Sequence, residues 1–330
     1  MIRLSARIAS LASLAALSMS VFVAAAQQQV PDAPAPDASA AAAPAPPPAP
    51  VFPKPNPADF NAAGPTKEAI NAFFQINWGF DQNRVWQVQA IQKTPIDGIS
   101  KVTMLAAEKG SRMEPQPIVF FISVDGKHIL SGEGIIRSDE HPFAENRAIL
   151  QQRADGPYRG SALKDLELVE FADFQCPHCK EAQANMERLA VDFPKARIVF
   201  ENFPLPQHPE AAQAAAYGVC VVKAGGSDAF FTFASAVFEG QDGLATPDGA
   251  ALTLNSAVTK AGLDPAKITA CAATPAAIDE VEASTKLARD LEINATPTLV
   301  VNGRMVLASA PYDTIKQIVA YQAKLDGLAP

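Results

Sequence analysis

The sequence predicts two folded domains, a small α+β domain followed by an α/β domain that carries a helical insertion. Three observations support this prediction. In the first half, an amphipathic helix precedes short runs in which apolar residues alternate, which is typical of an antiparallel sheet. The second half reads as strand, helix, strand, a long helical stretch, a hairpin and a final helix. The length of 330 residues suits about two domains.

The composition excludes two classes of protein. The net charge is −8 and no run of basic residues interrupts it, so no nucleic-acid partner is expected. Hydrophobic residues make up 48% of the chain, which is enough for a sizeable core and argues against a wholly disordered protein.

Residues 1–26 are predicted to be a signal peptide. Arg3 and Arg7 precede an apolar stretch from Ile8 to Val23, and small residues follow at 24–26. An uncleaved membrane anchor is the alternative, because the stretch approaches the shortest length that spans a bilayer. Either way, we expect a periplasmic or otherwise exported protein whose four cysteines face an oxidising compartment.

Residues 27–58 are predicted to form a disordered linker. Pro supplies 11 and Ala 10 of these 32 residues. Such a segment buries too little apolar surface to fold, and its prolines favour an extended, semi-rigid spacer.

Residues 59–152 are predicted to be the small α+β domain. The expected elements are a helix over 66–80, strands over 85–93, 99–106, 118–124 and 127–136, and a helix over 140–152. Asp125-Gly126 is a typical hairpin turn between the last two strands. The domain contains no cysteine, and His128 and His141 stand alone, so no catalytic site is predicted here.

Residues 156–328 are predicted to be the α/β domain. The expected elements are a strand over 166–171, a helix over 180–193, a strand over 197–203, helices over 210–290, strands over 298–301 and 305–308 around Asn302-Gly303, and a helix over 312–325. This order is that of a thioredoxin fold with an inserted helical subdomain.

Cys176-Pro177-His178-Cys179 lies where the first strand of this domain ends and a helix begins. The first turn of a helix has unpaired N–H groups and a positive dipole end, which stabilise a thiolate at Cys176. Pro177 suits that turn because its missing N–H costs nothing there. His178 can donate to the sulfur or act as a nearby cation. Cys179 lies on the same helix face, so it can resolve a mixed disulfide formed by Cys176.

Two cysteines at this spacing can serve three other roles. A structural zinc site needs four ligands, and His208 and Cys220 would have to come from distant segments. Covalent haem attachment needs a histidine at position 180, which is Lys180. An inert disulfide across two residues would be strained and therefore labile. The sequence thus favours redox chemistry, with no metal and no cofactor.

Two segments resemble the DsbA-type thiol:disulfide oxidoreductases of the thioredoxin superfamily. They are Val169-Glu-Phe-Ala-Asp-Phe-Gln-Cys-Pro-His-Cys179 and Ile293-Asn-Ala-Thr-Pro-Thr-Leu-Val-Val-Asn-Gly-Arg304. The resemblance implies that Pro297 is cis and packs beside the redox disulfide. It also implies that Thr296 presents its backbone to an extended substrate.

Glu170 matches the buried acidic position of that family. A carboxyl group in an apolar strand has a raised pKa, and it can accept and return the proton of Cys179. The alternative is an ordinary carboxylate on an edge strand.

Cys220 and Cys271 both fall in the helical insertion. Four cysteines allow three pairings, and one of them leaves the Cys176–Cys179 pair intact. We therefore expect a structural disulfide between Cys220 and Cys271, with two buried free thiols as the alternative.

The first domain resembles the cystatin-like dimerisation domain of the DsbC and DsbG disulfide isomerases. The residues that carry this likeness are Ile91-Gln-Lys-Thr-Pro-Ile-Asp-Gly98 and Phe121-Ile-Ser-Val-Asp-Gly-Lys-His-Ile-Leu-Ser-Gly132. The resemblance implies a homodimer, which we expect to pair through exposed edges of strands 99–106 and 118–124. A monomer whose first domain packs on its own second domain is the alternative.

Taken together, these features predict an exported thiol:disulfide oxidoreductase that acts on unfolded or misfolded exported proteins. A membrane redox partner is expected to reset the cysteine pair. Whether the enzyme oxidises or isomerises disulfides stays open at this point. The alternatives are a thiol reductase and a holdase or assembly chaperone without redox activity.

Overall fold

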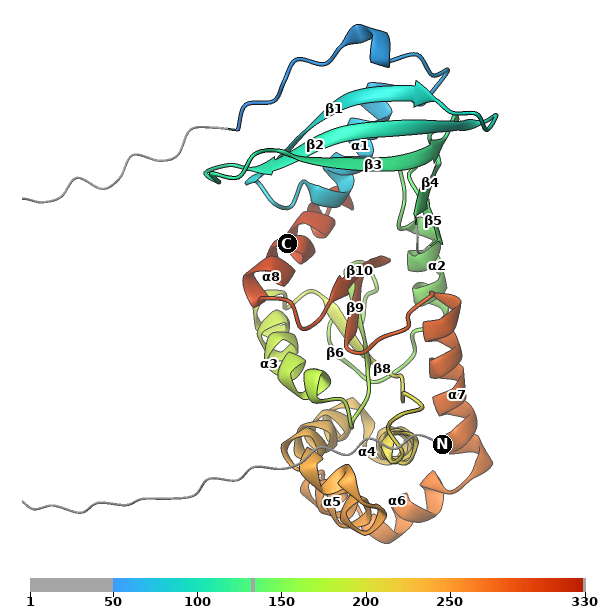
Figure 1. Cartoon of the computed structure of the whole chain (residues 1–330). Helices are drawn as coiled ribbons and strands as arrows, with labels where there is room; N and C mark the ends of the chain where they lie inside the picture. The colour runs from blue at the N-terminus through green and yellow to red at the C-terminus, as the bar shows by residue number, and fades with distance from the viewer. Residues whose placement is uncertain (1–49, 132–133, 329–330) are drawn as a thin grey trace, which may run out of the picture. The chain divides into compact units, whose positions relative to one another are not determined.

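The computed structural model describes residues 50–131 and 134–328 (Figure 1). The expected signal peptide over 1–26 and the linker residues 27–49 lie outside the described residues. Within the described ranges, no helix combines the length and the apolar composition needed to cross a membrane.

Residues 57–137 form an antiparallel sheet with one helix packed on it (Figure 1). The elements are η1 Pro57–Asp59, α1 Lys67–Trp78, β1 Arg84–Lys93, β2 Ile99–Glu108, β3 Gln116–Ser123, β4 His128–Ser131 and β5 Gly134–Arg137. Thr66 begins α1 by accepting a hydrogen bond from the N–H of Ala69. Ile70, Phe73 and Phe74 of α1 pack on the inner face of the sheet.

Two expectations for this sheet were wrong. The single strand expected over 127–136 is a hairpin of β4 and β5, because Gly132 and Gly134 interrupt the apolar run. The strands run in the order β1-β2-β3-β4-β5, so β2 is interior and offers no free edge. β3 pairs with β4 only at Phe121 and Ile122.

The helix expected from residue 140 begins later. The observed α2 spans Ala144–Arg153, with Phe143 as its N-cap. Pro142 explains the shift, because a residue before proline is disfavoured in helical conformation.

The second domain is built on a mixed sheet in the order β10-β9-β7-β8-β6. Its strands are β6 Tyr158–Gly160, β7 Glu167–Ala172, β8 Arg197–Asn202, β9 Thr298–Val301 and β10 Arg304–Leu307. β7 and β8 are parallel, whereas β9 is antiparallel to β7. The short edge strand β6 was not predicted, because three residues that end in glycine carry no alternating pattern.

On one face of this sheet lie α3 Pro177–Asp192 and α8 Tyr312–Leu325. On the other face lie α2 and α7 Pro275–Asp290. α3 begins at Pro177 with Cys176 as its N-cap, where the cysteine motif predicts it and three residues before the amphipathic range of 180–193. Every residue of β7 and β8 is buried, which is typical of central strands covered on both faces.

The insertion between β8 and β9 is helical, as its sequence predicts. It contains α4 Ala211–Glu239, η2 Gln241–Ala245, α5 Pro247–Lys260, α6 Pro265–Ala272 and α7 Pro275–Asp290. Thr246, Asp264 and Thr274 cap the last three helices, each of which opens with proline. The sulfur atoms of Cys220 in α4 and Cys271 in α6 are 1.99 Å apart, so a disulfide joins these two helices.

Candidate active site

Cys176 and Thr296 lie together although 120 residues separate them in sequence. The loop after β7 places Cys176 at the N-cap of α3, and the thiol donates to the carbonyl oxygen of Thr296 at 3.5 Å. The peptide bond between Thr296 and Pro297 is cis. Cys176 is 5% exposed and Cys179 is fully buried. The cysteine pair and the Thr296-Pro297 segment therefore form one site.

The two cysteines differ in acidity because their surroundings differ. A hydrogen bond from the Cys179 thiol lowers the pKa of Cys176 to about 5, and the backbone N–H groups of Cys179 and His178 add to this effect against partial burial. Burial raises the pKa of Cys179 above its ordinary value. Cys176 is consequently the thiolate of the pair near neutral pH, and Cys179 carries the proton.

Glu170 lies in β7, between β8 and β9 rather than at a sheet edge, and it is 2% exposed. Burial raises its pKa to about 7, while the charge of Arg159 and a hydrogen bond from Gln183 act in the opposite direction. The Gln183 side-chain amide donates to Glu170 Oε1 at 3.0 Å and to the carbonyl of Cys179 at 3.2 Å. A carboxyl group with this pKa can exchange a proton near neutral pH.

The ring of His178 contacts Glu181 rather than the sulfur of Cys176. His178 Nδ1 lies 3.1 Å from Glu181 Oε2, and this carboxylate raises the pKa of the exposed imidazole. His178 acts on Cys176 through its backbone N–H and, when protonated, through its charge.

Several polar residues of the site were not singled out from the sequence. The buried Asp173 carboxylate lies 2.8 Å from His208 Nδ1 and accepts from the N–H groups of Leu205 and Gln175, each at 2.7 Å. The N–H of Asp173 donates to Cys179 Sγ at 3.4 Å. Asp173 therefore holds the loop between β7 and α3, which carries Cys176. The sequence feature that could have pointed to Asp173 is its position inside the segment 169–179, next to the cysteine motif.

Arg159 was missed together with its strand. Its Nε is buried without a hydrogen-bond partner in the described structure, and its guanidinium lies 4.5 Å from the centre of the Phe231 ring. Burial lowers the pKa of Arg159, and the charge of Glu170 opposes that shift.

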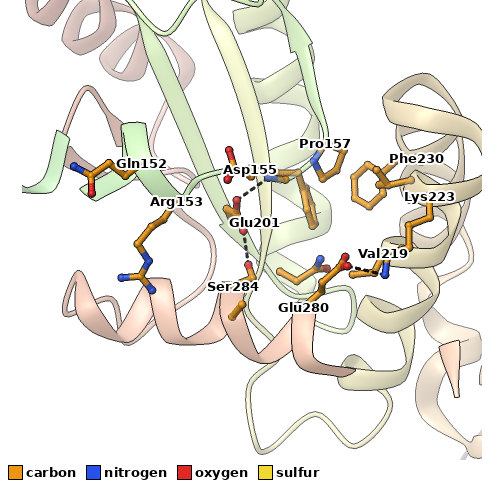
Figure 2. Close-up of a pocket in the computed structure, with 16 residues that line it drawn as sticks. Gln152, Arg153, Asp155, Pro157, Glu201, Val219, Lys223, Phe230, Glu280 and Ser284 are labelled. Atoms are coloured by element: carbon orange, nitrogen blue, oxygen red, sulfur yellow. Dashed lines mark hydrogen bonds and ion pairs between the residues drawn. The ribbon is translucent and has the colours of Figure 1, made fainter. Parts of the chain in front are cut away.

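A second buried glutamate lies on the other face of the sheet. Glu201 is directly opposite Phe171 in the β7–β8 ladder, one row beyond Glu170, so the two carboxyl groups point to opposite faces. Glu201 lines a cavity of about 400 Å³, and the Ser284 hydroxyl donates to its Oε2 at 2.5 Å. Figure 2 shows these two residues and their contact. Burial raises the pKa of Glu201 to about 7. In the same cavity, Lys223 Nζ forms an ion pair with Glu280 Oε1 at 2.6 Å. Neither cysteine of the redox pair lines this cavity.

Cys176 with its lowered pKa and the buried, protonated Cys179 three residues later are the two kinds of thiol that thiol–disulfide exchange requires. Residues 153–320 match the family model described as thioredoxin. This match covers just over half of the sequence, and the chain belongs to the thioredoxin family.

Individual relatives cover parts of the chain. Disulfide bond formation protein D of Bacillus subtilis is 28% identical over 174 residues, which are 51% of this chain and 77% of that protein. Na(+)/H(+) antiporter NhaA 3 of Salinispora tropica is 29% identical over 147 residues, 44% of this chain and 21% of the antiporter. The chain thus matches about a fifth of the antiporter's length.

Among solved structures, DsbA2 of Pseudomonas aeruginosa is 28% identical. The similarity covers 51% of this chain and 93% of that one, with a TM-score of 0.43.

Proposed function

We propose that the chain is an exported thiol:disulfide oxidoreductase that forms or rearranges disulfides in folding proteins. The observation that carries this proposal is the contrast between the two thiols, Cys176 with a pKa of about 5 and Cys179 with a raised one. The apolar segment near residues 8–23 supports export, and the family supports the redox chemistry.

In the oxidising direction, a substrate thiolate attacks Cys176 Sγ and breaks the bond between Cys176 and Cys179. Cys179 leaves as a thiolate and takes a proton, for which the Glu170 carboxyl is the donor. A second substrate thiolate then attacks the substrate sulfur of the mixed disulfide. This forms the substrate disulfide and releases the Cys176 thiolate, whose low pKa makes it a good leaving group.

Isomerisation uses the same groups in another order. The Cys176 thiolate attacks a wrong disulfide in the substrate, and a different substrate thiolate later displaces Cys176. If no such thiolate arrives, Cys179 attacks Cys176 and passes its proton to Glu170, so the substrate leaves reduced and the enzyme oxidised. A partner of the enzyme then has to reset the dithiol or disulfide state.

The acidity of Cys176 provides the test of this function. After reduction, the rate of alkylation by iodoacetamide should rise with a midpoint near pH 5, because only the thiolate reacts and its fraction grows above the pKa. Mass spectrometry should place the label on Cys176, and the Cys176→Ser variant supplies the background from Cys179. A midpoint near the free-cysteine value of about 8.5 would contradict the proposal.

We further propose that the first domain joins two copies of the chain through the outer face of its sheet. Phe121, Leu130 and Ile135 lie in one cross-strand row on that face, with Val119 beside it. These four side chains are 38–68% exposed. The resemblance to dimerisation domains favours a second copy as the occupant, and a contiguous apolar patch is typical of an interface.

The oligomeric state tests this second proposal. Light scattering on residues 27–330 at micromolar concentration should give the mass of two chains. Phe121→Glu should give the mass of one, because a charge in an apolar interface is costly. Val191→Glu, at a 78% exposed position of α3, is the matched control and should leave the dimer intact. A single-chain mass for the unmodified protein would reject the interface.

A further inference from the structure

The loop that carries Cys176 is held by the helical insertion. This loop runs from Asp173 to Cys176, between β7 and α3, and Cys176 caps α3 without a side-chain hydrogen bond. Among the described residues, the Phe174 carbonyl has no backbone donor, whereas the Cys176 carbonyl accepts from the N–H groups of Cys179 and Lys180. A buried carbonyl without a donor destabilises the folded state.

Gln241 of η2 supplies these donors. Its side chain is buried, and its Nε2 donates to the carbonyl of Phe174 at 2.8 Å and to the carbonyl of Cys176 at 3.0 Å. Both N–H groups of the amide are thus used on the residues that flank Gln175. The positive end of the amide dipole faces the peptide units next to the nucleophilic sulfur.

Gln175, in the loop itself, forms hydrogen bonds to the helical insertion. Its Nε2 donates to the carbonyl of Leu244 in η2 at 2.9 Å, and its Oε1 accepts from the N–H of Glu210 at 2.6 Å. Two glutamines, one on each side, therefore fasten the loop to the start of α4 and to η2. These contacts join residues 35–69 positions apart in the sequence, and no local sequence pattern marks them.

We propose that Gln241 is a positioning residue for the thiol–disulfide reaction, which holds the Cys176 backbone so that its sulfur faces Thr296 and the first turn of α3. This inference rests on the proposed redox function of Cys176. Without the two donors, the carbonyl of Phe174 loses its hydrogen-bond partner and the carbonyl of Cys176 keeps only the N–H groups of Cys179 and Lys180, so the loop relaxes away from η2. The Cys176 thiolate then loses part of its alignment with the N–H groups of Cys179 and His178.

The test substitutes Gln241→Met, which keeps the length and removes both donors. The titration midpoint of the thiolate, followed by its ultraviolet absorbance, should rise by about 0.5–1 pH unit. The equilibrium with glutathione should shift about three- to tenfold toward the disulfide form, because a less stable thiolate disfavours the reduced state. Both readouts report on the sulfur rather than on folding.

Two further variants keep the experiment decisive. Gln322→Met removes a buried glutamine of α8 whose hydrogen bonds go to Arg304 and Asp326, so it should lower stability and leave the midpoint unchanged. Gln241→Glu places acceptors against the same carbonyls and should raise the midpoint at least as far as Gln241→Met. If Gln241→Met does not fold, the titration midpoint of Gln241→Glu provides the test instead.

The outcomes separate the two proposals. If the unmodified protein titrates near pH 5 and both Gln241 variants do the same, the positioning role is wrong and the redox function stands. If the unmodified protein itself titrates near the free-cysteine value of about 8.5, the proposed function fails whatever the Gln241 variants do.

Discussion

Cys176→Ser is expected to abolish thiol–disulfide exchange, with turnover of a reduced or scrambled test protein falling about 10³-fold or more. A hydroxyl group cannot form the mixed disulfide, and Cys179 cannot replace it because it is fully buried with a raised pKa. The measurement is the rate of disulfide formation and of disulfide rearrangement in the test protein, at equal enzyme concentration.

Cys179→Ser is the informative companion to that variant. It retains the Cys176 nucleophile but lacks the group that resolves the mixed disulfide, so covalent enzyme–substrate complexes should accumulate. They should disappear on reduction. If the protein were a holdase, Cys176→Ser would still suppress the aggregation of unfolded proteins although it has no redox turnover. Full redox activity in Cys176→Ser would refute the assignment of the nucleophile.

The double variant Cys220→Ala/Cys271→Ala is expected to lower the free energy of unfolding by about 4 kcal/mol. The disulfide closes a loop with a sequence separation of 51, and the chain-entropy relation gives about this value for such a loop. Denaturant unfolding under oxidising conditions measures the difference. Below its unfolding transition the variant should keep its redox turnover, because the bridge lies in the insertion rather than at Cys176.

Reduction supplies the control for that comparison. When the disulfides of the unmodified protein are reduced, its unfolding curve should approach that of the double variant. Equal stability of the two proteins before reduction would show that the bridge does not constrain the unfolded chain.

Several parts of this protein can be predicted from neighbouring residues alone. Pro177 after a buried strand predicts the start of α3, and that start alone places Cys176 among unpaired N–H groups. Asn302-Gly303 predicts the hairpin of β9 and β10. Apolar spacing predicts α1 and α8 to within two residues. Each of these features depends on residues within one helix or one hairpin, so local chemistry is sufficient.

Tertiary structure alone decided the contacts between distant segments. Neither the Gln241 hydrogen bonds to the cysteine loop nor the charge of Arg159 near Glu170 follows a spacing rule, because each depends on how the insertion or an edge strand packs. Glu170 and Glu201 read alike as acids in apolar strands, and only the strand register assigns them to opposite faces. Strand order likewise made β2 an interior strand. The physical reason is that pairing and packing energies come from segments that meet only after the chain has folded.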